Sequence, residues 1–342
     1  MKKTIPALLL SLALLLCLTG CGQKAESAKA LNFDGLTFTD YKVFDAPVKS
    51  LRGMAASLDG KSLYTGHILL TANGVRKIDV ASGEEQWIFH DGSVGDWPEY
   101  AKGLAADDRG YVYAVVTYNK ASFISLFVID DSTGEMISET IVDLGLMDCG
   151  ANGVAVYKDG DKYYAYFITN YGANRIYCYD VTDPASPAIN PAFGVDGIVN
   201  LPLKTGVAEA DANYIAVGPD GSLYLTMKLA QGAKADAVAK FSNDGSKFEK
   251  VIDCEEAYGI SISGDYLIVS TYQAENSVVN IYKLSDYSLV ATVGGDVANH
   301  DHYSQAFLIG NKLYIADQSY QTGATEEDMG SRILVSGEIP EK

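Results

Sequence analysis

One short β-hairpin pattern recurs along the chain and limits what it can fold into. Residues 103–106 (GLAA) are followed by an Asp/Gly turn at 107–110 and by a second apolar run, YVYAV, at 111–115. The same design returns over residues 153–166 and 214–225. Two small apolar runs joined by such a turn predict a β-hairpin. A hairpin that recurs at a long, fairly regular interval predicts an array of similar β units.

The spacing of the repeat predicts four strands in each unit. The first strands are marked by Gly53, Gly103, Gly153, Tyr214, Gly259 and Gln305, at steps of 50, 50, 61, 45 and 46 residues. Second strands follow, most of them with a central Tyr such as Tyr64 or Tyr113. Third strands are expected at 75–80, 124–130, 175–180, 236–241, 278–284 and 332–336, and fourth strands at 86–89, 136–142, 188–193, 248–252 and 289–293. Four strands in 40–50 residues are typical of a propeller blade.

Two segments resemble blades of known propeller families. Residues 153–156 (GVAV) are similar to NHL-type blades, and residues 76–87 (RKIDVASGEEQW) are similar to PQQ-type blades. The resemblance covers about residues 36–339 and implies a propeller architecture but no activity. We therefore expect an all-β, six-bladed β-propeller domain over residues 36–342. The long third step, which includes the proline-rich residues 183–209, is interpreted as an insertion between blades three and four, with a seventh blade as the alternative.

The two ends of the domain are expected to meet in one blade. The sixth unit has only three predicted strands before the sequence ends at Lys342. Residues 36–44 (LTFTDYKVF) alternate in the manner of a strand and precede the first unit. We predict that they supply the missing outer strand of blade six, because pairing the two ends removes an open sheet edge.

The first 21 residues predict export and lipid anchoring. A basic pair, Lys2 and Lys3, precedes an apolar run at 5–16, which is too short to prefer spanning a membrane and indicates a secretory signal peptide at 1–20. Residues 18–21 (LTGC) resemble the bacterial lipobox, which implies that Cys21 becomes the mature N-terminus and carries acyl chains such as palmitate. Residues 21–35 would then be the lipidated cysteine and a flexible tether. The expected location is the extracytoplasmic face of a bacterial membrane.

The net charge limits the classes of binding partner, and the cysteine spacing limits the kinds of metal site and disulfide. The formal net charge of −18 disfavours nucleic acid and other polyanions. Cys149, Cys178 and Cys254 remain besides the lipid site, and their odd number and wide spacing match no metal motif. We expect them to be buried free thiols, with a Cys149–Cys254 disulfide as the alternative.

The predicted strand order gathers polar residues at one end of the central channel, here called the mouth. The residue before each first-strand marker is polar in all six units: Arg52, Lys102, Asn152, Asn213, Tyr258 and Ser304. Connections on the same face add Asn119, Asn170, Tyr171, Lys228, Gln273 and Trp97. Amides, phenols and cations around a concave opening are typical of a small-molecule site. The cations Arg52 and Lys102, on adjacent blades, suggest a carboxylate or phosphate on the ligand, while aromatic rings would stack on a sugar or aromatic group. The alternative is that these residues only face water or pair with nearby acids.

Evidence for catalysis is thin, and no catalytic residue is assigned. No nucleophile elbow or phosphate loop is present in the sequence. His67, His300 and His302 map to the mouth face and are weak candidates for a transition-metal site, although surface histidines are the favoured interpretation. The chain resembles lactonase-type six-bladed propellers in blade count, which implies a divalent metal near Asn152 and Asn213, but Arg52 stands where a carboxylate would be wanted.

We therefore expect a lipoprotein whose propeller binds a small molecule or a partner protein at the mouth. No cofactor is predicted. A metal-assisted hydrolase, lactonase or lyase at the same place is the alternative, and a scaffold subunit of a surface complex is the third.

Overall fold

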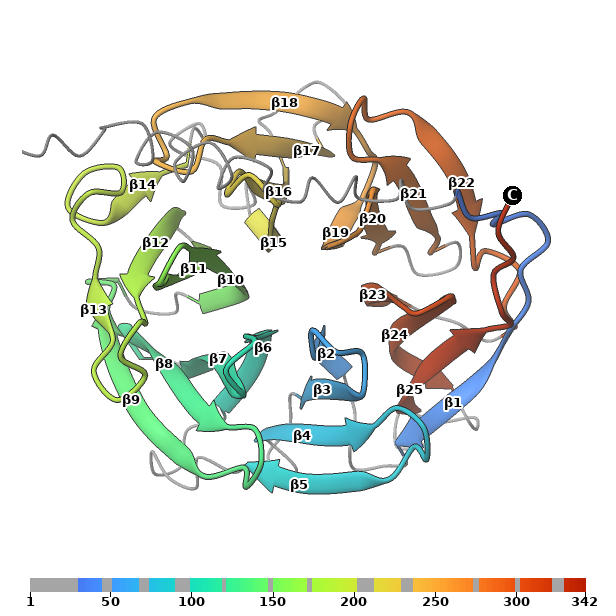
Figure 1. The fold of residues 1–342 in the computed structure, drawn as a ribbon, viewed down its shortest axis with the longest axis horizontal. Helices are drawn as coiled ribbons and strands as arrows, with labels where there is room; N and C mark the ends of the chain where they lie inside the picture. The colour runs from blue at the N-terminus through green and yellow to red at the C-terminus, as the bar shows by residue number, and fades with distance from the viewer. Residues whose placement is uncertain are drawn as a thin grey trace, which may run out of the picture.

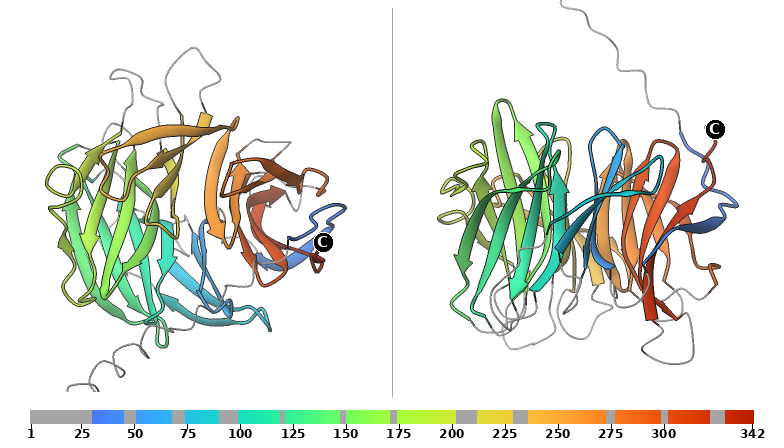
Figure 2. Two further views of the ribbon diagram at one scale, coloured as in Figure 1. Left: turned by 45° about the horizontal axis from the view of Figure 1, so that its top comes forward. Right: turned by 90° about the horizontal axis from the view of Figure 1, so that it is seen from below.

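Six small antiparallel sheets stand in a ring around a central channel (Figure 1). The computed structural model describes residues 30–44, 51–67, 74–89, 99–118, 121–146, 150–170, 174–201, 212–228, 236–272, 277–298, 302–321 and 329–342. Seen from the side, the strands run between the two faces of the ring (Figure 2). This confirms the expected six-bladed β-propeller, and the sheets of the described residues include no seventh blade.

Blades one to three follow one another along the chain. Blade one consists of β2 (Leu51–Ala56), β3 (Ser62–His67), β4 (Gly74–Asp79) and β5 (Glu85–Phe89). Blade two consists of β6 (Glu99–Ala106), β7 (Tyr111–Tyr118), β8 (Phe123–Asp130) and β9 (Met136–Asp143). Blade three consists of β10 (Gly150–Asp159), β11 (Lys162–Asn170), β12 (Arg175–Asp180), β13 (Ala188–Ile189) and β14 (Ile198–Asn200).

Blades four to six complete the ring. Blade four consists of β15 (Ala212–Val217), β16 (Leu223–Lys228), β17 (Asp236–Phe241) and β18 (Phe248–Asp253). Blade five consists of β19 (Ala257–Ser263), β20 (Tyr266–Thr271), β21 (Val279–Lys283) and β22 (Leu289–Val293). Blade six consists of β23 (Tyr303–Ile309), β24 (Lys312–Gln321), β25 (Met329–Ser336) and, from the other end of the domain, β1 (Phe38–Phe44).

The strand β1 closes blade six as predicted. It pairs antiparallel with β25, from Phe38 opposite Ser336 to Phe44 opposite Ser331, and lies beside it at the right of Figure 1. The Tyr41 hydroxyl on β1 then donates to backbone carbonyls of blade one at 2.9 and 3.0 Å. Upstream of β1, the side chain of Phe33 is also buried in the core. The N-terminal segment therefore joins blade six to blade one.

The long third step proves to be partly an interruption within blade three. The predicted fourth strand at 188–193 begins in the right place but is too long, because the chain leaves the sheet after Ile189. It turns through residues 190–197, where Gly194, Asp196 and Gly197 adopt positive φ angles, and returns as β14. The strands β13 and β14 pair with opposite ends of β12. Turn chemistry at this point overrides the strand pattern.

Glycines set how closely the inner strands approach one another. A Cβ on Gly53 would lie 2.5 Å from the carbonyl oxygen of Lys102 in the next blade, and one on Gly259 would lie 2.2 Å from that of Ser304. These are distances that a real side chain cannot adopt, so glycine is required where the blades converge on the channel.

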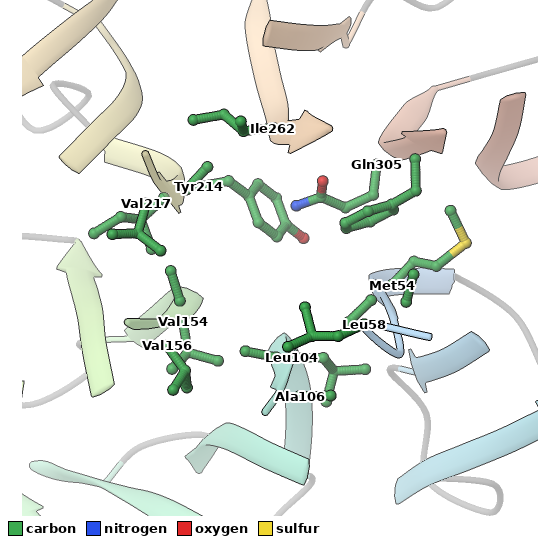
Figure 3. Close-up of a pocket in the computed structure, with 17 residues that line it drawn as sticks. Met54, Leu58, Leu104, Ala106, Val154, Val156, Tyr214, Val217, Ile262 and Gln305 are labelled. Carbon is green, nitrogen blue, oxygen red and sulfur yellow. The ribbon is translucent and has the colours of Figure 1, made fainter. Parts of the chain in front are cut away.

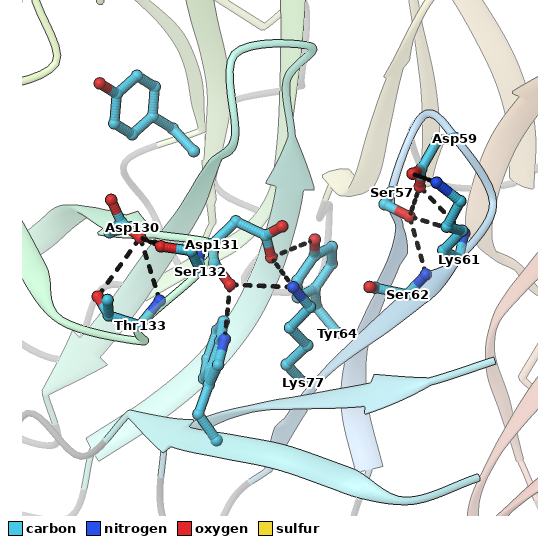
Figure 4. Close-up of polar contacts among 12 residues, drawn as sticks. Ser57, Asp59, Lys61, Ser62, Tyr64, Lys77, Asp130, Asp131, Ser132 and Thr133 are labelled. Carbon is cyan, nitrogen blue, oxygen red and sulfur yellow. Dashed lines mark hydrogen bonds and ion pairs between the residues drawn. The ribbon is translucent and has the colours of Figure 1, made fainter. Parts of the chain in front are cut away.

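Polar contacts tie the outer parts of blades one and two together (Figure 4). The Asp131 carboxylate accepts from the Tyr64 hydroxyl at 2.7 Å and pairs with the Lys77 ammonium at 2.8 Å. Its backbone carbonyl accepts from Trp87 Nε1 at 2.8 Å. Trp87 is the last residue of the PQQ-like segment, and its ring leaves room only for Gly134 beneath it. This segment of blade one therefore packs against blade two.

Two further findings concern the cysteines and the membrane. Cys178 and Cys254 are buried and neither forms a disulfide, as expected, whereas Cys149 and Cys21 lie outside the described residues. Within the described ranges, no helix has the length and hydropathy needed to cross a membrane.

Candidate functional site

Each first strand carries a β-bulge at the predicted mouth residue. The pairing register shifts between Leu51 and Gly53, Ala101 and Gly103, Ala151 and Gly153, Ala212 and Tyr214, Ala257 and Ile260, and Tyr303 and Gln305. The residues passed over include all six predicted ones: Arg52, Lys102, Asn152, Asn213, Tyr258 and Ser304. A bulge leaves a residue out of the ladder and redirects its side chain. The fold therefore places these six residues at equivalent points around the ring.

Three of the six side chains are buried and join neighbouring blades. Asn152, Asn213 and Ser304 are 4%, 8% and 0% exposed. Each donates to the carbonyl that precedes the bulge of the next blade: Asn152 Nδ2 to Ala212 at 3.4 Å, Asn213 Nδ2 to Ala257 at 2.9 Å, and Ser304 Oγ to Leu51 at 2.8 Å. These side chains link adjacent blades. The same hydrogen bonds satisfy their buried donor groups.

The other three, Arg52, Lys102 and Tyr258, are half-buried. The Nη1 atom of Arg52 donates to the Tyr258 hydroxyl at 3.0 Å, which links blade one to blade five across the ring. The Nζ atom of Lys102 donates to Asn152 Oδ1 at 3.3 Å. Both cations are thus held in place at the mouth while part of each stays open to solvent.

A cluster of aromatic rings, tilted by 30–32° to one another, lies beside Arg52. The rings of Tyr258 and Tyr272 are 4.4 Å apart, and those of Tyr272 and His302 are 3.8 Å apart. The Arg52 guanidinium lies 5.6 Å from the centre of the Tyr272 ring. The Tyr272 hydroxyl accepts from Gln318 Nε2 at 3.1 Å. This cluster combines a cation with flat apolar faces, which suits a ring-shaped polar ligand.

Tyr214 is the central residue that the sequence pattern did not single out as a site. Its hydroxyl donates to the backbone carbonyl of Arg52 on the opposite side of the channel, and its ring lies in the middle of the ring of blades (Figure 3). Burial raises the pKa of the Tyr214 phenol well above its usual value, so the phenol remains a donor. The available signal was a tyrosine at a position where four of six repeats have glycine.

His67 lies in the core rather than at an open mouth. It is 0% exposed, its Nε2 is 3.1 Å from Thr65 Oγ1, and its ring meets Phe44 at 4.8 Å. Burial, with the charge of Arg76 second, lowers the pKa of His67 to about 3. In the described part of the chain, no three His, Cys, Asp or Glu side chains are grouped in a way that could hold a metal ion.

The remaining predicted residues are placed in part. Asn170 is buried at 1% exposure at the mouth end of β11. Lys228 ends β16, and only its backbone is described. Asn119, Tyr171, Gln273, Trp97 and His300 lie outside the described residues.

Solved structures with the same fold belong to proteins of differing activity. The chain is similar to a gluconolactonase from Xanthomonas campestris (12% identity, 92% of this chain and 93% of that one, TM-score 0.57). It is similar to a PQQ-bound aldose sugar dehydrogenase from Streptomyces coelicolor (13% identity, 91% and 100%, TM-score 0.54) and to a luciferin-regenerating enzyme (11% identity, 90% and 98%, TM-score 0.55). No protein-family profile and no curated protein sequence matches it. Identities this low show the shared propeller fold alone.

Proposed function

We propose that this protein is a lipid-anchored, extracytoplasmic binding protein whose propeller mouth takes a small anionic ligand of sugar-like character. The observation that carries the proposal is the ring of six equivalent bulges. It brings Arg52 and Lys102 of adjacent blades to one end of the channel in a chain of net charge −18. Two cations held in an otherwise acidic protein favour an anionic partner.

The surroundings of the two cations support a ligand with a ring. Tyr258 and Tyr272 place two tilted aromatic rings next to Arg52, and aromatic rings pack against the apolar side of a sugar. A carboxylate or phosphate would accept charge-assisted hydrogen bonds from the half-buried cations. A sugar acid or sugar phosphate combines both features.

A thermal-shift panel of sugar acids, sugar phosphates and neutral sugars tests the proposal. We expect an anionic member to raise the melting temperature of the wild type, and Arg52→Met with Lys102→Met to abolish that rise. Lys61→Met is the matched control, because Lys61 lies at the opposite end of blade one, paired with Asp59. An equal rise in all three proteins would refute the cationic mouth.

Metal-assisted hydrolysis at the mouth is a second candidate, suggested by the gluconolactonase of like fold. It ranks lower because Asn152, one of the two asparagines considered as ligands, already accepts from Lys102 through its Oδ1. Metal analysis of the purified protein separates the two proposals: a stoichiometric divalent ion that is lost in Asn213→Ala would favour the hydrolase.

The anchoring proposal has its own test. We expect wild-type protein expressed in bacteria to incorporate a palmitate analogue and to sediment with membranes, and Cys21→Ser to do neither. Cys17→Ser, within the same signal segment, is the control and should behave as the wild type. Label retained by Cys21→Ser would place acylation elsewhere.

A further inference from the structure

The described chain begins on the face of the propeller opposite the mouth, here called the underside. First strands start at the mouth, so the turns that join first and second strands lie on the underside. The backbone N of Leu31 donates to the hydroxyl of Tyr266, the first residue of β20, at 2.8 Å. At the other end of the chain, Ile339 N donates at 2.7 Å to Asn311 O, in the turn between β23 and β24. The first described residues, in dark blue, and the C-terminus lie together at the upper end of the ring in the right-hand view of Figure 2.

The chain is held against the propeller from residue 30 onward. Leu31 and Phe33 are only 8% and 2% exposed, and both belong to the apolar core between blades five and six. Two backbone hydrogen bonds, of 2.8 and 2.7 Å, join residues 30–32 to residues 340–342. Buried apolar side chains and paired backbone groups fix a segment in place. A tether that ends at residue 30 therefore leaves the propeller at the underside.

The length of this tether limits which face can approach a membrane. Nine residues, 21–29, separate the proposed lipid anchor from residue 30. Fully extended, they span at most about 30 Å. The strand β24 has 10 residues and runs between the underside and the mouth, which is also about 30 Å. The mouth could reach the membrane only if the whole tether lay stretched along the side of the ring, and such an arrangement costs the most conformational entropy.

We infer that the underside is the membrane-facing surface of this protein and that the mouth opens away from the membrane. The inference rests on the acylation of Cys21 proposed above. It also narrows the ligand proposed for the mouth. A site directed away from the membrane takes a molecule dissolved in the surrounding medium, and not a headgroup of the lipids that hold the anchor.

Charge does not favour a different orientation. Beside the point where the chain leaves the underside, the Lys312 ammonium pairs with the Glu338 carboxylate at 3.4 Å. The net charge of −18 gives the chain no overall attraction to anionic lipids. The length of the tether and its point of attachment, rather than lipid charge, therefore set the orientation.

Energy transfer to a labelled membrane tests the orientation. The full-length acylated chain is placed in neutral phosphatidylcholine vesicles that contain a rhodamine-labelled lipid as the acceptor. A donor dye is attached at Asp265→Cys, between β19 and β20 on the underside, or at Asp296→Cys, between β22 and β23 on the mouth face. Both aspartates are exposed and lie in the same part of the ring. Cys149→Ser is included in both proteins, and the buried Cys178 and Cys254 are protected from the dye.

We expect the rate of energy transfer from position 265 to exceed that from position 296 by at least about twofold. The strands of blade five, such as the seven-residue β19, hold the two labels roughly 20 Å apart, and energy transfer falls steeply with distance. Insertion of about thirty Gly and Ser residues between residues 29 and 30 should bring the ratio close to one, because a long flexible tether lets either face approach the membrane.

Each outcome has a separate meaning. Vesicle-bound protein with equal transfer from the two positions, or with more from position 296, overturns the orientation and leaves the anchoring intact. A ratio that the insertion does not change overturns the role of the tether. Protein that stays off the vesicles and transfers from neither position, as Cys21→Ser should, refutes the anchoring and the orientation with it.

Discussion

The hydroxyl of Tyr214 in blade four donates a hydrogen bond to the backbone carbonyl of Arg52 in blade one, across the centre of the propeller. Most contacts that stabilise a propeller join neighbouring sheets, but this one joins sheets on opposite sides of the ring. It fixes the backbone of a mouth residue, and Tyr214 is also one of the residues that line the pocket in the central channel. Tyr214 therefore links opposite sides of the ring at the centre of the channel.

Removing that hydroxyl should destabilise the protein measurably. We expect Tyr214→Phe to lower the free energy of unfolding by about 1–2 kcal/mol, because the Arg52 carbonyl loses its donor in a buried place. Urea denaturation measures the change. Tyr164→Phe is the control, since the Tyr164 hydroxyl forms no hydrogen bond in the described structure, and it should cost less than about 0.5 kcal/mol. Equal effects of the two changes would argue against the cross-channel bond.

Closure by β1 should be essential to the stability of the ring. Deleting residues 36–44 removes Phe44 from the core and exposes the edge of β25, so we expect a loss of at least about 3 kcal/mol and a marked drop in melting temperature. Deleting residues 22–29 should leave the melting temperature unchanged. Calorimetry compares the two deletions, and an unaltered melting temperature in the first would contradict the closure.

Glycine at the convergence of the blades should tolerate no side chain. We expect Gly53→Ala and Gly259→Ala each to cost roughly 2 kcal/mol or more, because the added carbon would meet rigid backbone oxygens of the next blade. Gly337→Ala is the matched control, with no atom within 4 Å of its added carbon. Thermal unfolding of the three variants checks this, and a neutral Gly53→Ala would show that the inner strands can move apart.

Buried His67 should make the protein less stable in mild acid. Its pKa is lowered to about 3 in the folded state, first by burial, against 6.5 for an exposed histidine. Below pH 6.5 the unfolded chain takes up a proton that the folded chain does not, so stability falls as the pH drops. We expect this residue to account for about 2–3 kcal/mol of the loss between pH 7 and pH 4.5.

Urea midpoints across that pH range measure the effect. His67→Leu should show a smaller loss than the wild type, whereas Thr65→Val, which removes the contact to Nε2 but keeps the imidazole, should retain the wild-type slope. If His67→Leu and the wild type lose stability in parallel, the histidine is not the titrating group.

The mouth residues show that a repeat pattern predicts the positions of residues but not their contacts. Because Arg52, Lys102 and their equivalents precede the same position of the same strand in every repeat, their placement at one end of the channel followed from the sequence. Their contacts did not. The sequence pattern predicted Ser304 and Asn213 as ligand-binding residues. Their side chains instead bind backbone carbonyls that lie 253 and 44 residues away along the chain. Such pairings arise only when the ring closes.

Local patterns of turns, small residues and alternating apolar positions were sufficient to determine the strands, the blades and the strand β1 that closes them, because these depend on neighbours along the chain and on a period that repeats. The interruption after Ile189, the burial of His67, the Tyr214 bridge and the buried, unpartnered Oε1 of Gln305 were decided by the tertiary structure alone. Each depends on which side chains from distant repeats meet at the centre of the ring or between its sheets, and a periodic sequence does not specify these meetings.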